Sequence, residues 1–246
     1  MGGLPAPAVF RVPKYGSTRA EYEDAMAWSR RQRRFAVADG ASASAFARLW
    51  ARLLVQAYVA GGLRAANLEH DLAPLQARWL ADVEQRDLPW YAAEQARRGA
   101  FAALVGLALH ADGRWAALAV GDCCVFHVRG RQLLAAVPLS QPDAFDARPL
   151  LLGSRAAANV GLRAAGAIVS AEGTWQPGDT FLLMSDALAA TFLRVASTMD
   201  GPIDALDFER NPSGFRHWIN QLRAERLLHN DDVSLMWLAL PTDAAA

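Results

Sequence analysis

Residues 35–40 read Phe35-Ala36-Val37-Ala38-Asp39-Gly40, a short apolar run that ends abruptly at Asp39-Gly40. Four apolar residues followed at once by Asp-Gly predict a buried strand that carries an acidic side chain at its end. Apolar residues then recur at helical spacing from Phe46 to Ala57, Ser42 or Ser44 can cap the start, and Gly61-Gly62 ends the pattern. This part of the sequence therefore predicts a core strand followed by an amphipathic helix.

Acidic residues occupy similar positions at other strand boundaries. Asp122 and Asp186 each follow an apolar run, Asp231 lies just before the final one, and the pair Glu23-Asp24 precedes the first. One such Asp is ordinary, because Asp favours turns. Carboxylates gathered at one edge of a sheet, however, repel one another and are costly to bury unless a cation joins them. The pattern therefore predicts a site for Mg²⁺ or Mn²⁺, and the absence of a His/Cys ligand set disfavours Zn²⁺.

The remaining hydrophobic pattern alternates groups of strands with groups of helices. Residues 138–165 lack a firm period and are expected to form a variable surface or lid segment. We expect one domain over residues 1–246, of the α+β class, with two antiparallel sheets packed on each other and helices outside. Strands are expected at 101–110, 115–120, 125–128, 133–137, 167–175, 180–185 and 233–240, and further helices at 72–83, 89–98, 187–196 and 215–228.

Composition limits the classes of function. The chain has 246 residues, of which 53% are hydrophobic, and this is enough for a substantial core. Its 25 basic and 25 acidic side chains balance, so nothing indicates a nucleic acid or an anionic membrane as an obligatory partner. No secretory leader or membrane-spanning window is evident, and we expect a cytoplasmic monomer. The adjacent Cys123 and Cys124 are expected to be buried thiols.

Five short motifs carry a resemblance to a known family. The motifs are Arg19-Ala20-Glu21-Tyr22-Glu23-Asp24-Ala25, Val37-Ala38-Asp39-Gly40, Val120-Gly121-Asp122, Ser185-Asp186 and Asp231-Asp232-Val233-Ser234. In order and approximate spacing they resemble the motifs of the protein phosphatase 2C family, over roughly residues 16–240. The resemblance implies the family's four-layer α-β-β-α sandwich and the hydrolysis of phosphoserine and phosphothreonine in proteins modified by a serine/threonine kinase.

The same resemblance implies metal ligands. Asp39 would bridge two Mn²⁺ or Mg²⁺ ions, and Asp186 and Asp231 would complete the first metal site. The Gly40 carbonyl would serve the second site together with Glu23, through water. A hydroxide held between the two metals would then attack phosphorus in line.

Two further residues have counterparts in the family. Arg19 resembles the phosphate-binding arginine, and its planar guanidinium can donate to two phosphate oxygens at once. Asp122, together with Asp186, resembles the pair that holds a third, weaker metal in bacterial members. The implied site therefore combines a carboxylate cluster with one phosphate-binding cation.

The chain departs from the family pattern beside these motifs. Ala41-Ser42-Ala43 stands where many members have His-Gly-Gly, so a proposed general acid is missing. His229 could supply a proton, or it is an ordinary exposed loop histidine. The leading interpretation is an active phosphatase. The alternatives are a pseudophosphatase that binds phosphoproteins without turnover, and a regulator that docks into a stress or secretion assembly through residues 138–165.

A dense basic run precedes the first core strand and comprises Arg30, Arg31, Arg33 and Arg34. Its plainest interpretation is a solvated turn. The sharper alternative is a contact for the acidic flank of a phosphopeptide.

Overall fold

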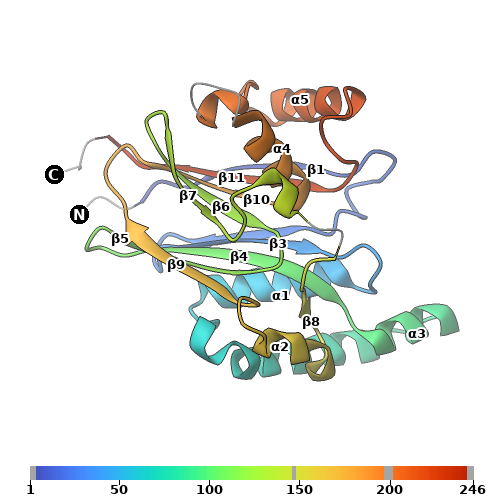
Figure 1. Cartoon of the computed structure of the whole chain (residues 1–246). Coiled ribbons are helices and arrows are strands. Elements are labelled where there is room, and N and C mark those ends of the chain that lie inside the picture. Colours follow the sequence, from blue (N-terminus) through green and yellow to red (C-terminus); the bar gives the residue numbers. More distant parts are fainter. Residues whose placement is uncertain (1–3, 146–147, 197–201, 243–246) are drawn as a thin grey trace.

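The computed structural model describes residues 4–145, 148–196 and 202–242, and two antiparallel sheets form its centre (Figure 1). One sheet has the strand order β1-β11-β10-β6-β7 and the other β2-β3-β4-β5-β9, with β8 paired to β4. The strands are β1 (Ala8–Val12), β2 (Ala25–Ser29), β3 (Arg34–Gly40), β4 (Phe101–Leu109), β5 (Arg114–Val120), β6 (Cys124–Arg129), β7 (Gln132–Val137), β8 (Leu152–Gly153), β9 (Val169–Thr174), β10 (Thr180–Met184) and β11 (Val233–Ala239).

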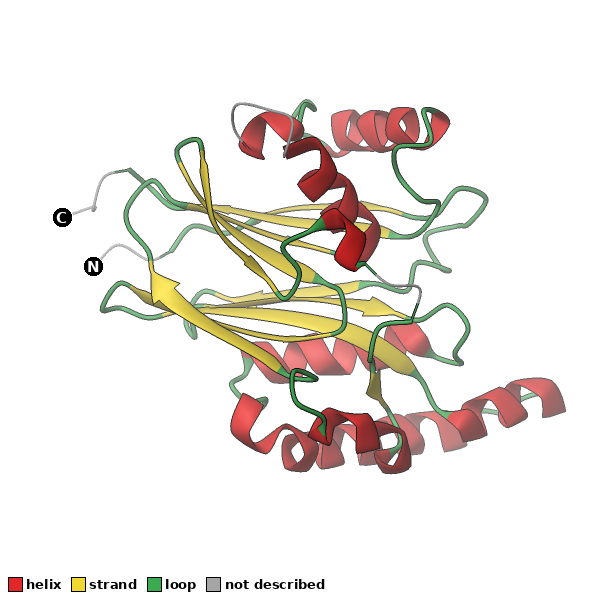
Figure 2. Ribbon diagram, in the orientation of Figure 1, coloured by secondary structure: helices red, strands yellow, loops and turns green. Residues whose placement is uncertain are grey.

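Helices cover the outer faces of both sheets (Figure 2). The helix α1 (Ala47–Val59) packs on β2, β3 and β4, with α2 (Leu68–Glu84) packed against α1. On the other side, α4 (Asp186–Ala196) contacts β11 and α5 (Pro212–Ala224) contacts β1. The result is the α-β-β-α sandwich of the α+β class that the sequence predicts. The remaining helical elements are α3 (Trp90–Arg98), η1 (Ala65–Asn67), η2 (Pro142–Ala144), η3 (Ala156–Arg163) and η4 (Pro202–Ala205).

Alternation along β3 assigns its side chains to two cores. Phe35 and Val37 are fully buried between the sheets, where Phe181 of β10 joins them. Ala36 and Ala38 belong to the second core, on the α1 side of the sheet. Burying an aromatic side chain such as Phe35 contributes about 1.5–3 kcal/mol. An uninterrupted apolar run therefore forms here because both faces of the strand are covered.

Small residues under α1 let the helix lie close to the sheet. Gly106 of β4 pairs with Ala36, and the ring of Tyr58 occupies the space that a Cβ at Gly106 would need. The guanidinium of Arg34 lies 5.3 Å from the centre of the Tyr58 ring. This packing fixes α1 on the outer face of the strand that ends at Asp39 and Gly40.

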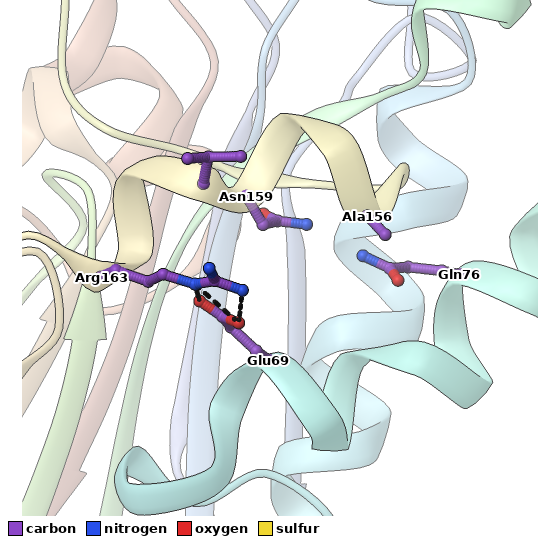
Figure 3. Close-up of a pocket in the computed structure, with 6 residues that line it drawn as sticks. Glu69, Gln76, Ala156, Asn159 and Arg163 are labelled. Carbon is purple, nitrogen blue, oxygen red and sulfur yellow. Dashed lines mark hydrogen bonds and ion pairs between the residues drawn. The ribbon is translucent and has the colours of Figure 1, made fainter.

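The second half of the 138–165 segment is anchored to the α2 layer. Leu152 and Leu162 are buried, and the side chain of Asn159 exchanges hydrogen bonds of 2.8 Å with the backbone N–H and carbonyl of Gly153. Figure 3 shows Arg163 of η3 paired with Glu69 of α2, at 3.0 Å. The sequence pattern did not indicate these anchors, because the buried residues are too few to set a period. A lid role for the segment stays a prediction.

A buried polar network closes the opposite end of the sandwich from Gly40. Asp179, which is fully buried just before β10, accepts hydrogen bonds from His127 Nε2 at 2.8 Å and from Arg129 Nε at 2.7 Å. It also accepts one from the backbone N–H of Gln176 at 2.8 Å. Burial raises the pKa of Asp179, but the hydrogen bonds from Arg129 and His127 outweigh burial and leave this pKa below its ordinary value. The carboxylate therefore stabilises the fold in its charged form.

Asp179→Asn is expected to lower the free energy of unfolding by about 3 kcal/mol at pH 7, because it leaves the donors of His127 and Arg129 without their charged acceptor. The difference from wild type should shrink as pH falls through the lowered pKa, since the wild-type carboxylate then becomes protonated. Urea denaturation followed by circular dichroism measures both effects. Asp112→Asn is a matched control, because Asp112 pairs with Arg114 on an exposed turn. Equal denaturation midpoints for Asp179→Asn and wild type would contradict the assignment.

Candidate active site

Strand register brings the predicted acidic residues to one end of the sandwich. In the β2–β3 pair Ala25 lies opposite Ala38, and continuing this register places Asp24 opposite Asp39. In the β10–β11 pair Met184 lies opposite Leu235, which places Asp186 beside the residues that lead into β11. The ends of β3 and β10 and the starts of β2 and β11 therefore meet at the same edge of the two sheets.

Electrostatic coupling shows that these carboxylates lie close together. Burial raises the pKa of Asp39 well above its ordinary value, and the charges of Asp24, Asp186 and Asp231 raise it further. Burial, and then Asp231, raise the pKa of Asp186. Burial, and then Asp186, raise the pKa of Asp122 to about 7. The structure thus places four of the predicted side chains, Asp39, Asp122, Asp186 and Asp231, in one cluster.

Asp24 is a member of this cluster that the sequence analysis did not assign. Its side chain is 4% exposed, its Oδ2 accepts a hydrogen bond of 2.8 Å from Ser234 Oγ, and its Oδ1 has no hydrogen-bond partner. Burial is the main cause that raises the pKa of Asp24 to about 8, with a further contribution from the charge of Asp232. The alternation of side chains along β2 and its register with β3 are the signals that point to Asp24.

Glu23 is placed differently from Asp24. Its carboxylate lies 3.5 Å from the ammonium of Lys14 and is 20% exposed. Its backbone N–H donates to Asp232 Oδ2 at 2.7 Å. The charge of Glu23 is not among the main causes that raise the pKa of Asp39. The structure therefore brings Glu23 to the rim of the cluster, while its neighbour Asp24 lies inside.

Gly40 is required by a close backbone approach. A Cβ at this position would lie 2.8 Å from the carbonyl oxygen of Glu23 and 3.0 Å from the backbone of Ala47. Any other residue would push β3 away from β2 and α1. The glycine thus keeps the backbone after Asp39 against the segment that leads into β2, which is where the resemblance implies that the Gly40 carbonyl acts.

Asp232 and Lys14 are two further residues that the sequence analysis missed. Asp232 is 2% exposed, and its two oxygens accept hydrogen bonds from the backbone N–H groups of Lys14 and Glu23, at 2.9 and 2.7 Å. It therefore ties the 13–24 loop to the start of β11. Lys14 Nζ lies 2.7 Å from Ser42 Oγ, in the loop that departs from the family's His-Gly-Gly. Neither contact leaves a signal in local sequence, because both join segments far apart in the chain.

The chemistry of the cluster fits a hard cation. Its donors are all carboxylate oxygens, burial and mutual repulsion raise the pKa of Asp39, Asp186 and Asp122, and Asp24 Oδ1 is buried without a partner. Within residues 4–145, 148–196 and 202–242, however, no three His, Cys, Asp or Glu side chains converge on one point closely enough to hold an ion. The donor type of the cluster therefore suits a hard cation, whereas its side chains do not converge as the ligands of a bound ion do.

Arg19 lies outside the carboxylate cluster, in the loop between β1 and β2. It is exposed, and no hydrogen bond or ion pair of its side chain occurs within the described part of the chain. It lines a surface pocket of about 330 Å³ together with Arg11, Tyr22 and Arg48. The guanidinium is thus free to take a ligand, as its predicted role in phosphate binding requires.

Arg19→Ala is expected to lower kcat/KM for a phosphothreonine peptide by about tenfold, because a charge-assisted hydrogen bond contributes about 1.5–3 kcal/mol. Most of the change should appear in KM if Arg19 holds the phosphate equally in the ground and transition states. Arg19→Lys should recover only part of the loss, since a point charge cannot donate two parallel hydrogen bonds. Steady-state kinetics measure these effects, and unchanged constants in Arg19→Ala would remove the residue from the site.

His229 is exposed at the edge of the cluster. Its charge is among the factors that lower the pKa of Asp186, so the imidazole lies within electrostatic reach of that carboxylate. The structure therefore leaves open the role of His229 as a proton donor. The other histidines are not among the main causes of the pKa shifts of the cluster carboxylates Asp24, Asp39, Asp122 and Asp186.

The described chain is thus a four-layer sandwich with carboxylates gathered at one end of its two sheets. The sequence model of the protein phosphatase 2C family matches residues 17–231. The chain belongs to the protein phosphatase 2C family, as its motifs predict, and this membership supports protein phosphatase activity. No curated protein sequence shows significant similarity to the chain.

Solved structures of phosphatases share the fold along almost the whole chain. The serine/threonine phosphatase PstP/Ppp of Mycobacterium tuberculosis has a TM-score of 0.61 at 17% identity, over 96% of this chain and 98% of that one. The photosystem II phosphatase PBCP has a TM-score of 0.59 at 16% identity, over 97% and 99%. PppA, a regulatory component of T6SS in Pseudomonas aeruginosa, has a TM-score of 0.54 at 21% identity, over 97% and 100%. At these identities the likeness shows the fold alone.

The length and apolar character of a helix decide whether it can cross a membrane. Among the described residues, none of the helices combines the length and the apolar character that crossing a bilayer requires.

Proposed function

We propose that this protein hydrolyses phosphoserine and phosphothreonine in phosphoproteins, with two divalent cations, Mn²⁺ or Mg²⁺, at the carboxylate cluster. The observation that carries the proposal is the coupling of Asp24, Asp39, Asp186 and Asp231 at one end of a protein phosphatase 2C fold. The raised pKa values of Asp24, Asp39 and Asp186 favour a bound cation, because each of these carboxyl groups would otherwise stay costly to ionise. The catalytic domain of PstP, which shares this fold at 17% identity and a TM-score of 0.57, was solved in complex with 2 manganese ions.

Individual residues take distinct roles in this proposal. Asp39 would lie between the two ions, and Asp186 and Asp231 would complete the first site. The Gly40 carbonyl would serve the second site, and Glu23 would act there through water. Bound cations supply positive charge and lower the pKa of a water molecule, so that a nucleophile is available at neutral pH.

Three more residues complete the proposed site. Asp122, with Asp186, would hold a third and weaker ion. Asp24 supplies a buried carboxylate oxygen without a hydrogen-bond partner, which makes it a further acceptor for a cation or for its bound water. Arg19 would bind the phosphate oxygens and stabilise the charge that builds up on them during transfer to water.

The alternative, a pseudophosphatase, follows from the departures beside the motifs. Ala41 replaces the family's histidine, and Lys14 with Ser42 occupies the adjoining loop. Hydrolysis of p-nitrophenyl phosphate and of a phosphothreonine peptide, with Mn²⁺ present, separates the two proposals. Turnover of the peptide supports the enzyme. Metal binding by calorimetry without turnover of either substrate would favour the pseudophosphatase.

The missing histidine leads to a prediction about the leaving group. A nitrophenolate departs without a proton, whereas a serine alkoxide needs one, so only the phosphopeptide requires an acid. If His229 supplies this proton, His229→Ala should lower kcat for the phosphopeptide by about 10²-fold and change p-nitrophenyl phosphate turnover by less than about twofold. His217→Ala is a matched control, because this histidine is exposed on α5. Equal losses on both substrates would contradict an acid role for His229.

Physiological partners follow from the same proposal. The substrate would be a protein phosphorylated by a serine/threonine kinase, with the phosphatase acting as a cytoplasmic monomer that needs no nucleic acid or membrane. The balanced charge of 25 basic and 25 acidic side chains supports the proposal that neither nucleic acid nor membrane is required.

A further inference from the structure

A groove lined by arginines runs along the outer edge of β2, next to the carboxylate cluster. It has a volume of about 440 Å³, and Arg11 of β1 together with Arg48 and Arg52 of α1 line its walls. Asp24 also lines it, which places the groove beside the candidate active site. It shares Arg11 and Arg48 with the pocket of Arg19, so the two hollows adjoin each other.

The arginines of this groove are largely free to bind a ligand. Within the described residues, the side chains of Arg11 and Arg52 form no hydrogen bond or ion pair, and Arg48 makes one hydrogen bond of 3.2 Å, to the carbonyl of Ala20. All three are exposed. Asp24 is the one acidic side chain in the lining, and it is 4% exposed and forms no ion pair with these arginines. The groove therefore carries positive charge that no carboxylate in its walls neutralises.

The floor of the groove is the free edge of a strand. β2 is an edge strand of its sheet, so one side of its backbone has no strand partner. Ala25, Met26 and Ala27 all line the groove, although successive side chains of a strand point to opposite faces. A hollow that touches all three residues must follow the edge of the strand. Ala25 and Met26 are buried, so the groove is open to a partner at its arginine walls, and its elongated shape suits an extended peptide with side chains toward the arginines.

The basic run at residues 30–34 is less available to a partner, because most of its arginines already make contacts within the chain. Arg30 donates to the carbonyl of Leu4 and Arg33 to that of Leu109, at 2.7 and 3.0 Å. Arg34 lies over the ring of Tyr58. These arginines mainly hold the β2–β3 turn and the sheet in place. Within the described residues, Arg31 is the one member of the run without a hydrogen bond, ion pair or ring contact, whereas the groove brings three exposed arginines together.

We infer that the groove lined by Arg11, Arg48 and Arg52 binds an acidic, extended segment of the phosphoprotein substrate, adjacent to its phosphorylated residue. This inference rests on the proposed function, which identifies the bound segment as part of a phosphoprotein substrate. The carboxylates of Asp or Glu side chains would pair with the guanidinium groups, while Arg19 and the carboxylate cluster hold the phosphate. The enzyme would accordingly favour phosphosites with acidic neighbours over sites with neutral ones.

The test compares two phosphothreonine peptides that differ only in their flanks, one acidic and one neutral. The double variant Arg48→Glu/Arg52→Glu should reduce the ratio of their kcat/KM values by about tenfold, because it reverses two charges of the groove. Arg19 is left unchanged, since its predicted role is at the phosphate itself. Arg78→Glu/Arg216→Glu is the matched control, because both arginines are exposed on helices outside the groove.

Fluorescence anisotropy of the labelled acidic peptide gives a readout that does not depend on turnover. Wild type and the control should bind the peptide, more weakly as salt rises, and the groove variant should bind it at least tenfold less tightly. Loss of binding only in the groove variant supports the inference even if no peptide is hydrolysed, in which case the proposed function alone fails. Equal ratios and equal affinities in both double variants would overturn the inference while leaving the proposed function intact.

Discussion

Excess EDTA is expected to lower the hydrolysis of p-nitrophenyl phosphate and of a phosphothreonine peptide by about 10³-fold or more, and added Mn²⁺ or Mg²⁺ should restore it. The reason lies in the charge of the site. Burial and the charges of Asp24, Asp186 and Asp231 raise the pKa of Asp39, so the site disfavours further negative charge already in the absence of a phosphate ester. Cations have to offset that effect before an anionic ester can bind and react.

Two further measurements sharpen this prediction. EDTA saturated with Mg²⁺ before its addition controls for effects of the chelator other than metal removal. Mn²⁺ should also raise Tm, since an ion that binds only the native state stabilises it by about 2.7 kcal/mol at a hundred times its Kd. Undiminished turnover in excess free EDTA, or a Tm that does not respond to Mn²⁺ or Mg²⁺, would contradict a metal at the cluster.

The positions of Asp39, Asp122, Asp186 and Asp231 could be predicted from sequence because each adjoins a strong apolar run. Such a run predicts a strand, and a residue next to the end of that strand then lies at the edge of the sheet. The alternation of strand and helix patterns was likewise enough to predict the two sheets and their outer helices, since hydrophobic periodicity depends on which face of an element is buried.

Other features depend on contacts between distant parts of the chain. The choice between Glu23 and Asp24 is set by the register of β2 against β3, in which a shift of one residue exchanges inward and outward side chains. Lys14 reaches Ser42 and Asp232 holds the Lys14 backbone only because the chain folds back between these segments. The arginine groove combines β1, β2 and α1 in the same way. No local sequence pattern encodes a contact between distant segments, so the positions of these residues could be identified only from the structure.

Asp39→Asn is expected to reduce kcat by about 10³-fold, which corresponds to about 4 kcal/mol of lost transition-state stabilisation. Asp39 would be the ligand shared by two cations, and an amide offers one neutral oxygen where the carboxylate offers two charged ones. Asp87→Asn is a matched control, because Asp87 is exposed in the loop after α2 and should keep wild-type activity.

The same variant should not weaken the fold when metal is removed. Burial and the charges of Asp24, Asp186 and Asp231 raise the pKa of Asp39, so the folded state favours the protonated acid. Stability from such a group is lost as pH rises above the ordinary pKa of a carboxyl, and a neutral Asn avoids that loss. In EDTA at pH 7, the Tm of Asp39→Asn should therefore equal or exceed that of wild type. A variant that keeps wild-type kcat, or whose Tm in EDTA falls by several degrees, would show that Asp39 serves the fold and not a metal.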